Sequence, residues 1–466
     1  MDRNAIKRRL IILIVVLYLL VPFAFLFFRY VSKAFPKKAN ITINTRGVVG
    51  SLFFNWQALA QGGEERGRMF ANVIPAVSEL TPKYIRIDHI YDYYDVVSRD
   101  GSGNLTLNWT SLDETVCDIF ATGAKPFFVL GYMPPPMSSD GTLVGVPTNW
   151  NEWSDLVQKT IERYSGRSTV LCGKVTGDRL SNIYYEVWNE PDLETFGKWS
   201  LWGGAKDYKT LYHFSSAGAQ RAQNVSLFFL GGPATTAAYK NWFQVFLDYV
   251  EQNRLRIDFL SWHHYTVNPD DYIDDVSRID SWLIDKKYKY RKLPKIITEW
   301  GYDSNPAPIA DTAVGAAYTI ASVRNIIDQK VRYAFSFEVK DGPTPRWGIL
   351  SYQGEKKPRY HALKFMNLLE GYRLSVGGEG TYVKAIASFS PKKAVVILTN
   401  YDREGKNTEL VPLTFTGIVP GRYQMLTTYL DGTQVKSANF TVRAPRLQRS
   451  VLLPPNTVAA VELIRQ

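Results

Sequence analysis

The stretch Ile183-Tyr-Tyr-Glu-Val-Trp-Asn-Glu-Pro191 is an apolar run that ends in Asn189, Glu190 and a proline. A second run, Lys295-Ile-Ile-Thr-Glu-Trp-Gly301, carries Glu299 close to its end. β-Branched and aromatic residues favour strands, so each glutamate is expected at the C-terminal tip of a short strand. Two such carboxylates can serve as an acid/base and a nucleophile if the fold brings the tips together.

Short apolar runs of this kind recur about every 30–60 residues between residues 48 and 337, separated by segments with helical character. The eight expected strands are Val48–Phe54, Tyr84–Ile87, Pro126–Leu130, Ile183–Trp188, Ser226–Leu230, Phe259–Trp262, Lys295–Thr298 and Tyr333–Phe337. Between them, Ser111-Leu-Asp-Glu114 has the pattern of a capping box, and Asp155–Tyr164 and Asp311–Gln329 have helical apolar spacing.

Eight strand–helix units predict an α/β fold, a (β/α)8 TIM barrel over residues 46–370. A doubly wound open sheet is the alternative architecture. It would be expected to carry a Gly-rich phosphate turn after its first strand, where this chain has Leu52-Phe-Phe-Asn-Trp56. The sequence therefore favours the barrel.

The pattern of apolar and turn-forming residues changes after the expected helix Pro358–Glu370. Residues 371–466 hold short runs punctuated by Gly, Asn and Pro, which predict a compact antiparallel β-sandwich domain. The runs are Tyr382–Ser388, Lys393–Asn400, Thr408–Phe415, Gln424–Tyr429 and Val458–Ile464. Such a domain can bind glycan or cover the helices of the barrel, and we favour the second role.

The N-terminal region predicts a membrane anchor. After a short segment, residues 1–9, the 19 residues 10–28 carry no charge, which is about the length of a transmembrane helix. A cleaved signal peptide is the alternative, but its apolar region is shorter. Residues 29–45 are expected to form a basic, poorly structured stalk. The short N-terminal segment favours a single-pass membrane protein with its catalytic domain extracytoplasmic, in the periplasm or outside the cell.

The net charge of +11 is concentrated at the N-terminus, because residues 1–38 hold eight basic side chains and one acid, which leaves +4 for the other 428 residues. This distribution argues against a nucleic-acid partner. Cys117 and Cys172 show no metal-ligand spacing, and we interpret them as unpaired thiols. The sequence predicts no metal site and no organic cofactor.

Polar and aromatic side chains stand at the expected C-terminal ends of five barrel strands, where barrel active sites are built. They are Arg86, Asp88, His89, Asn189, Glu190, His263, His264, Tyr265, Glu299 and, just beyond the last strand, Trp347. A purely structural barrel would not be expected to gather so many buried polar groups on one rim. Taken singly, His263 and His264 are better interpreted as orienting residues than as metal ligands.

These motifs resemble a known family. Asn-Glu-Pro after the fourth strand and a glutamate at the tip of the seventh resemble clan A glycoside hydrolases, and Tyr-Glu-Val-Trp-Asn-Glu-Pro-Asp192 resembles glycoside hydrolase family 39. That family contains β-xylosidases and α-L-iduronidases, and the chain also resembles its membrane-anchored bacterial members that trim exopolysaccharides. The resemblance covers roughly residues 45–370.

The resemblance implies a role for each matching residue. Glu190 would be the acid/base and Glu299 the nucleophile. Arg86 would keep Glu299 ionised, Tyr265 would orient it, and Asn189 would bind the sugar 2-hydroxyl. Trp347 would form the floor of the subsite. Independently of these roles, we predict that His89 and His263 are also substrate-binding residues.

The second strand departs from the family pattern. It has Arg86-Ile-Asp-His89 where the family has a histidine two residues after the arginine, so the roles of Asp88 and His89 stay open. Trp300-Gly301 after the expected nucleophile resembles endo-acting clan members and weakly favours a polymer-cleaving cleft.

The expected function is a membrane-anchored retaining glycoside hydrolase that cleaves O-glycosidic bonds of an extracytoplasmic poly- or oligosaccharide. Retention requires the two carboxyl groups to lie about 5 Å apart. A non-catalytic carbohydrate-binding or scaffold protein and a transglycosylase are the alternatives. Retention of both carboxylates with Arg86, Asn189 and Tyr265 favours catalysis, whereas the acceptor, water or sugar, is not readable from the sequence.

Overall fold

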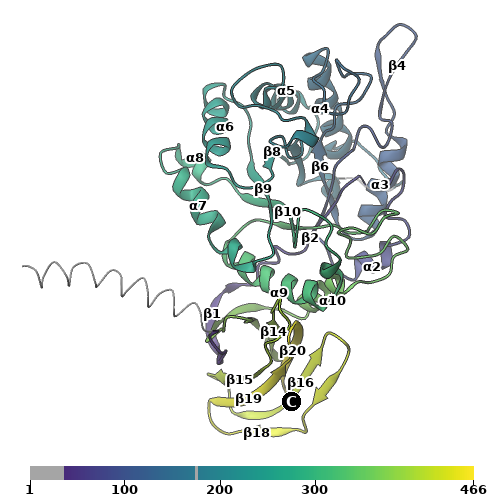
Figure 1. Ribbon diagram of the computed structural model, residues 1–466. Helices are drawn as coiled ribbons and strands as arrows, with labels where there is room; N and C mark the ends of the chain where they lie inside the picture. The colour runs from purple at the N-terminus through teal and green to yellow at the C-terminus, as the bar shows by residue number, and fades with distance from the viewer. Residues whose placement is uncertain (1–35, 64, 174–176) are drawn as a thin grey trace, which may run out of the picture.

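The computed structural model describes residues 36–63, 65–173 and 177–466 of the chain. Eight parallel strands close into a barrel in the order β10, β11, β2, β3, β6, β7, β8, β9 (Figure 1). They are β2 (Ala58–Gln61), β3 (Tyr84–Ile87), β6 (Lys125–Leu130), β7 (Ile183–Val187), β8 (Phe228–Thr235), β9 (Phe259–Tyr265), β10 (Lys295–Gly301) and β11 (Ala334–Phe337). The predicted TIM barrel is confirmed.

Helices follow the barrel strands along the chain. The α-helices are α2 (Ile74–Ser78), α3 (Thr110–Ala121), α4 (Trp150–Ser165), α5 (Tyr208–Arg221), α6 (Lys240–Gln252), α7 (Asp275–Trp282), α8 (Tyr288–Arg291), α9 (Ala313–Asp328) and α10 (Pro358–Met366). Short 3-10 turns are η1 (Gly177–Leu180), η2 (Glu194–Phe196), η3 (Pro269–Asp274) and η4 (Pro308–Asp311), and β4 (Val97–Arg99) and β5 (Leu105–Leu107) form a hairpin.

None of the helices in these described ranges combines the length and the apolarity that a bilayer crossing requires. The predicted anchor over residues 10–28 and the short segment before it lie outside the described residues.

The lower part of the barrel interior is filled with aromatic side chains. Strand alternation explains this, because Tyr84 of β3 points inward while Ile85 and Ile87 join the outer core under the helices. Phe127 and Tyr184 stack inside with ring centroids 5.3 Å apart. The other buried members of this inner cluster are Ala58, Ala60, Phe259, Ile296, Tyr333, Phe335 and Phe337. The polar groups described below therefore stand on a packed floor.

The N-termini of the barrel helices differ in how they are capped. Side-chain oxygens of Asn149, Asp207 and Thr312 accept backbone N–H bonds at the starts of α4, α5 and α9. The capping box predicted at Ser111–Glu114 is wrong, because α3 already begins at Thr110 and Ser111 lies inside it. The chain instead turns into α3 through Asn108, whose Oδ1 accepts the N–H of Thr110, a local bond that competes with the box for the helix start.

Cys117 and Cys172 form a disulfide, so the prediction of two unpaired thiols is wrong. Cys117 lies on α3 and Cys172 follows α4, the next helix around the barrel. The packing of these neighbouring helices brings the two Cα atoms to 5.7 Å although the residues are 55 positions apart. Such a long closed loop gives no local sequence signal for the pairing.

A second sheet of ten strands forms the other part of the molecule and curls around its own apolar core, as the predicted β-sandwich would (Figure 1). Its order is β17, β16, β20, β14, β13, β12, β1, β15, β19, and β18 pairs with β16. The strands are β1 (Ile41–Ser51), β12 (Tyr372–Gly377), β13 (Val383–Phe389), β14 (Lys393–Asn400), β15 (Glu409–Thr416), β16 (Gly421–Tyr429), β17 (Gln434–Lys436), β18 (Phe440–Val442), β19 (Arg446–Leu453) and β20 (Thr457–Arg465).

The strand expected at Val48–Phe54 does not belong to the barrel. Residues 41–51 form β1, which pairs antiparallel with β12 and parallel with β15 in the second sheet. This segment also takes up the end of the expected stalk. The error has a physical reason: Val48 and Val49 are apolar but 52% and 64% exposed, whereas the true first barrel strand is the short run Ala-Leu-Ala-Gln with little β-propensity.

The second sheet is buried on both faces where it meets the barrel. In β14, Val395 and Ile397 pack into the core shared with the barrel, whereas Val396 and Leu398 pack into the sheet's own core. The Thr399 hydroxyl also donates to the Ala317 carbonyl of α9 at 3.1 Å. This arrangement agrees with the favoured role of the domain, which was to cover the helices of the barrel.

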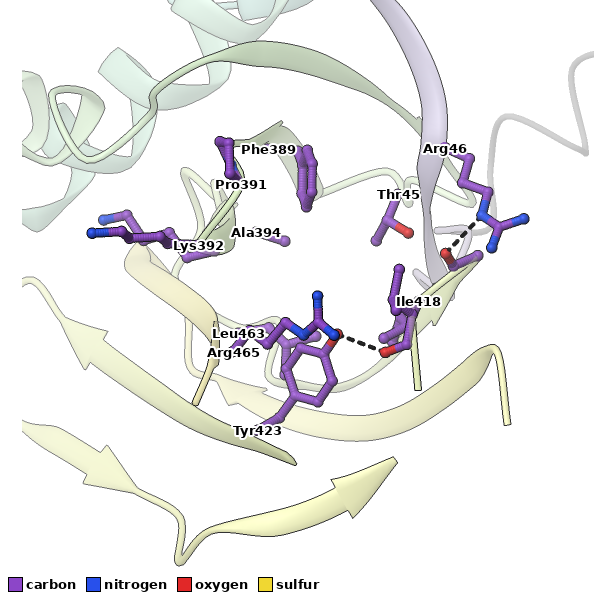
Figure 2. A pocket seen from close by; sticks show the side chains of 13 residues that line it. Thr45, Arg46, Phe389, Pro391, Lys392, Ala394, Ile418, Tyr423, Leu463 and Arg465 are labelled. Atoms are coloured by element: carbon purple, nitrogen blue, oxygen red, sulfur yellow. Dashed lines mark hydrogen bonds between the residues drawn. The ribbon is translucent and has the colours of Figure 1, made fainter. Parts of the chain in front are cut away.

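One end of the curled sheet forms a pocket of about 260 Å³. Figure 2 shows its lining, with apolar side chains inside and Arg46, Lys392 and Arg465 around it. All residues of this lining come from the second sheet and its turns, so the pocket is separate from the barrel interior.

Candidate active site

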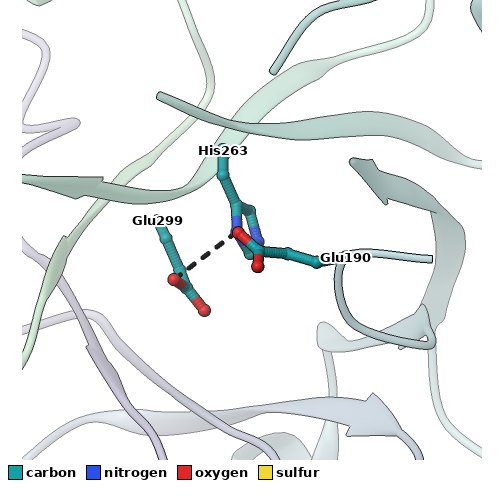
Figure 3. Close-up of side chains that lie close together, drawn as sticks. All are labelled: Glu190, His263 and Glu299. Carbon is teal, nitrogen blue, oxygen red and sulfur yellow. Dashed lines mark hydrogen bonds and ion pairs between the residues drawn. The ribbon is translucent and has the colours of Figure 1, made fainter. Parts of the chain in front are cut away.

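Glu190, His263 and Glu299 meet at the carboxyl end of the barrel, from β7, β9 and β10 (Figure 3). One polar atom from each lies within 4.8 Å of the others. His263 Nδ1 lies 2.8 Å from Glu190 Oε1 and 3.4 Å from Glu299 Oε2, so the imidazole bridges the two carboxylates. The two glutamates that the sequence singled out are therefore brought together at a separation comparable to that of retaining glycosidases.

A β-bulge turns Glu299 into the barrel. In the pairing of β10 with β9, Ile297 lies opposite Trp262 and Glu299 lies opposite His263, so Thr298 is an extra residue. Without it, simple alternation from the inward-facing Ile296 would send Glu299 outward to the helices. The bulge thus sets the direction of this carboxylate.

Arg86 is the buried cation of the site and has no exposed surface. Its guanidinium donates to Glu186 Oε2 at 2.8 Å, to Glu299 Oε1 at 2.7 Å and to Asn189 Oδ1 at 2.7 Å. Burial alone would lower the pKa of Arg86, but the carboxylates of Glu186 and Glu299 raise it above its ordinary value. Arg86 is therefore a permanent charge in the site.

The environment of Glu299 opposes and supports its ionisation at once. Burial raises the pKa of its carboxyl above the ordinary value and Glu190 adds to that effect, whereas His263, Arg86 and the Tyr265 hydroxyl act to lower it. Tyr265 Oη donates to Glu299 Oε2 at 2.7 Å. Burial and the neighbouring Glu299 raise the pKa of Tyr265, so its hydroxyl stays protonated and remains a donor.

His263 is fully buried beside both carboxylates. Burial by itself lowers the pKa of His263, but the negative charges of Glu299 and Glu190 outweigh burial, and the pKa lies above its ordinary value. A ring that holds its proton on Nδ1 can donate toward Glu190 and Glu299, which are both within 3.4 Å of that atom. The trio offers donor atoms for a cation, but the Arg86 guanidinium in contact with Glu299 would repel one.

Asn189 lies beside Arg86 and is buried. Its Oδ1 accepts from Arg86, and its Nδ2 donates to the Tyr132 hydroxyl at 2.9 Å. The amide is thus fixed in orientation on both sides, at the end of the strand that also delivers Glu190. Its expected contact with a sugar hydroxyl stays a prediction.

His89 and Trp347, two further residues predicted for the site, are held by aromatic packing and by hydrogen bonds to neighbouring residues. His89 Nδ1 lies 2.7 Å from Asp92 Oδ2, and its ring packs on Tyr132 at a centroid distance of 4.4 Å. Trp347 is half-buried, packs against Phe337 at 5.5 Å and donates from Nε1 to the Asp303 carbonyl. His264 turns away from the cluster, with Nδ1 2.6 Å from Asp275 of α7.

Glu186 and Tyr132 belong to the site and were not assigned a role from the sequence. Glu186 is fully buried and pairs with Arg86, and Tyr132 accepts from Asn189. The sequence could have predicted the position of Glu186. Side chains alternate along β7, so Glu186 lies on the same inner face of the barrel as Tyr184. Tyr132 stands two residues beyond β6, one of the three barrel strands for which no end residue was named.

A closed parallel barrel with facing carboxylates at the carboxyl ends of its strands defines the class of (β/α)8 glycoside hydrolases. The chain belongs to glycosyl hydrolases family 39, whose family model matches residues 68–432. The resemblance inferred from the motifs is confirmed.

Two β-xylosidases are similar in sequence. The protein from Geobacillus stearothermophilus is 27% identical over 321 residues, which is 61% of either chain. The protein from Caldicellulosiruptor saccharolyticus is 25% identical over 359 residues, 70% of either chain. The match to the first of these relatives thus spans about three-fifths of its length.

Solved structures share the fold over nearly the whole described chain. A monomeric β-xylosidase from Caulobacter crescentus CB15 superposes with a TM-score of 0.75 at 22% identity, covering 92% of this chain and 99% of that one. The family 39 enzyme from Xanthomonas axonopodis pv. citri gives 0.73 at 19%, covering 92% and 98%. At these identities the likeness establishes the architecture of barrel and second sheet.

Proposed function

We propose that the protein is a retaining glycosidase in which Glu299 is the nucleophile and Glu190 the acid/base. The observation that carries this proposal is the juxtaposition of the two carboxylates, with polar atoms within 4.8 Å of each other through His263. That gap accommodates an anomeric carbon and its leaving oxygen but leaves no room for the extra water of an inverting enzyme.

The contacts of the two glutamates differ and support this division of roles. Glu299 touches a guanidinium and a phenol hydroxyl, which stabilise negative charge on a nucleophile. Glu190 contacts His263 and is the more exposed of the two, with 13% of its side chain accessible against 8% for Glu299. Its backbone adopts a left-handed φ of 41°, a strained conformation that is common at functional residues.

The reaction proceeds in two balanced steps. Glu299 attacks the anomeric carbon while Glu190 gives its proton to the departing oxygen, which leaves a glycosyl–enzyme ester and a free alcohol. Glu190, now a carboxylate, then takes a proton from water as the water oxygen attacks the same carbon and releases Glu299. Arg86 and Tyr265 keep their contacts with Glu299 oxygens and orient it for both steps.

The substrate class is proposed as a poly- or oligosaccharide with β-xyloside-like glycosidic bonds. The similarity to two proteins named β-xylosidase supports this class. Endo or exo action depends on the loops around the mouth.

We also propose that the protein is anchored in a membrane with its catalytic part extracytoplasmic. The uncharged stretch 10–28 with basic flanks supports the anchor. The Cys117–Cys172 disulfide supports an oxidising compartment, since such bonds are rare in reducing cytosol. Protease accessibility of the folded domain in intact cells or spheroplasts tests the orientation.

The catalytic assignment is tested with Glu299→Gln and Glu190→Gln in the full-length chain. Glu299→Gln is expected to lower turnover of aryl glycosides by about 10³-fold or more. An activated fluoro-sugar should label Glu299 covalently, and Glu190→Gln should turn over only substrates with good leaving groups. Glu194→Gln is the matched control, since Glu194 lies in the next turn and is 77% exposed. Unchanged turnover in Glu299→Gln, or labelling elsewhere, would refute the assignment.

A further inference from the structure

Asp88 is a buried carboxylate at the mouth of the barrel that the mechanism above does not use. It follows β3 directly, and alternation along that strand puts Tyr84, Arg86 and Asp88 on the inner face. The residue is 6% exposed. Within the described part of the chain, its Oδ1 is buried and has no hydrogen-bond partner.

The surroundings of Asp88 are those of the two glutamates. Burial raises the pKa of its carboxyl, while the charges of His89, Arg86 and His263 act to lower it. Burial is the largest cause that raises the pKa of Tyr132, and the charges of Asp88 and Glu299 raise it further. Both carboxylates therefore act on this phenol. Asp88 therefore lies close enough to Arg86 and His263 for the charges that surround the two glutamates to act on it.

Among the residues that the structure describes, no side chain or backbone group donates to Asp88 Oδ1. The three donor nitrogens of Arg86 are directed at Glu186, Glu299 and Asn189. Tyr132 Oη accepts from Asn189 Nδ2, and within the described residues no hydrogen bond joins Tyr132 to Asp88 Oδ1. A buried carboxylate oxygen without a donor destabilises the folded chain, so its presence calls for a ligand that supplies one.

We propose that Asp88 is a substrate-binding residue that accepts hydrogen bonds from ring hydroxyls of the sugar attacked by Glu299, and that it selects neutral glycosides over uronic acids. This inference rests on the proposed glycosidase function and deepens it. A hydroxyl of the bound sugar can supply a donor to this carboxylate, whose residue keeps 6% of its surface accessible. A sugar carboxylate in the same place would meet a like charge and bring no proton to share.

A second acid strengthens this selection. Glu338 stands directly after β11, is fully buried, and accepts from Gln61 Nε2 at 3.2 Å through Oε2. β11, β2 and β3 are consecutive strands of the barrel, so Glu338 and Asp88 stand at the ends of one arc of the mouth. Arg86 already contacts two carboxylates, and the buried guanidinium of Arg359 donates to Ser336 Oγ and to the carbonyl groups of Phe337 and Trp347. The mouth therefore opposes an additional anion.

The test compares two substrates that differ at one carbon, 4-nitrophenyl β-D-glucopyranoside and 4-nitrophenyl β-D-glucuronide, with the β-D-xylopyranoside as a neutral reference. Asp88→Asn keeps the shape and removes the charge. It is expected to lower kcat/KM for the neutral glycosides by about 10- to 100-fold, the value of a hydrogen bond to a charged group. It should also reduce the preference for glucoside over glucuronide by about tenfold or more.

Asp118→Asn is the matched control, because Asp118 is a buried acid of the following helix that pairs with Arg68 outside the site. Asp118→Asn should change neither kcat/KM for the neutral glycosides nor the preference for glucoside over glucuronide. Titration of the wild-type chain with D-glucose and D-glucuronate adds a measurement that needs no variant, and only the neutral sugar is expected to bind.

Three outcomes would overturn the inference. The first is wild-type cleavage of the glucuronide as fast as the glucoside, and the second is an Asp88→Asn enzyme within twofold of wild type in both rate and preference. The third is a wild-type chain that cleaves no glycoside and is not labelled at Glu299, which removes the proposed function and this inference together. In the first two cases Glu299→Gln still abolishes turnover, so the proposed function stands.

Discussion

The core of the second sheet and the mouth of the barrel are equally buried but are built from opposite chemistry. The sheet core is apolar, with residues such as Val396 and Leu398 fully covered. The mouth buries Arg86, Glu186, His263 and most of Glu299. Burial of apolar area stabilises the folded chain, whereas burial of charge opposes it unless every charge has a partner. The barrel thus holds these charged groups in an arrangement whose unfavourable free energy the apolar cores offset.

Removing the central cation should have the largest effect on the mouth. Arg86→Met leaves Glu186 and Glu299 buried without their cation, so we expect a loss of about 3–5 kcal/mol in the free energy of unfolding. Turnover should fall by about 10²- to 10³-fold. Denaturant unfolding and glycoside kinetics measure the two effects. Arg66→Met is the control, since the Arg66 and Asp95 side chains of that ion pair are 69% and 86% exposed, and equal losses in both variants would contradict the comparison.

A cavity in the sheet core should affect stability alone. Leu398→Ala removes a fully buried side chain and is expected to lower the free energy of unfolding by about 2–5 kcal/mol. Turnover measured well below the melting temperature should stay within about twofold of wild type. Leu410→Ala, at a position that is 66% exposed, is the matched control in the same sheet. A large loss of turnover in Leu398→Ala would mean that the two regions are coupled.

The disulfide should contribute less to the free energy of unfolding than the buried cation of the mouth or the apolar core of the second sheet. Replacing Cys117 and Cys172 by serine opens a loop of 55 residues and is expected to cost about 2–4 kcal/mol of stability. Thermal unfolding with and without reductant measures it. Reductant should destabilise the wild type and leave the double variant unchanged; a reductant effect that persists in the variant would exclude this bond as its source.

The smallest effect concerns the charge of Glu299 and its dependence on pH. Its pKa in the folded protein lies above the ordinary carboxyl value, so the unfolded chain loses its proton first as pH rises. The free energy of unfolding then falls as pH rises from the pKa of this carboxyl in the unfolded chain to its higher pKa in the folded protein. Glu299→Gln cannot ionise, so it should melt higher than wild type at pH 7, with the difference vanishing near pH 4. A variant that melts lower at pH 7 would contradict this sign.

The sequence was sufficient to predict the barrel, seven of its strands and the two glutamates, because strand-forming runs and their polar ends are local features. It was insufficient for β1 and β2, since Val48 and Val49 look like core residues and Ala58–Gln61 does not look like a strand. The direction of Glu299 depends on a bulge at Thr298, and the pairing of Cys117 with Cys172 depends on helix packing. Both are properties of neighbouring chain segments and leave no trace in the local pattern.

The position of β1 in the second sheet makes the barrel an insertion into that sheet, because the chain enters through β1 and returns at β12. A mechanical force applied at residue 36 would therefore act first on β1, along its two flanking strands, and reach the barrel only after these ladders part. Bonds loaded in parallel by such shear share the force. The geometry of Glu190 and Glu299 is thus insulated from tension on the N-terminal side of the molecule.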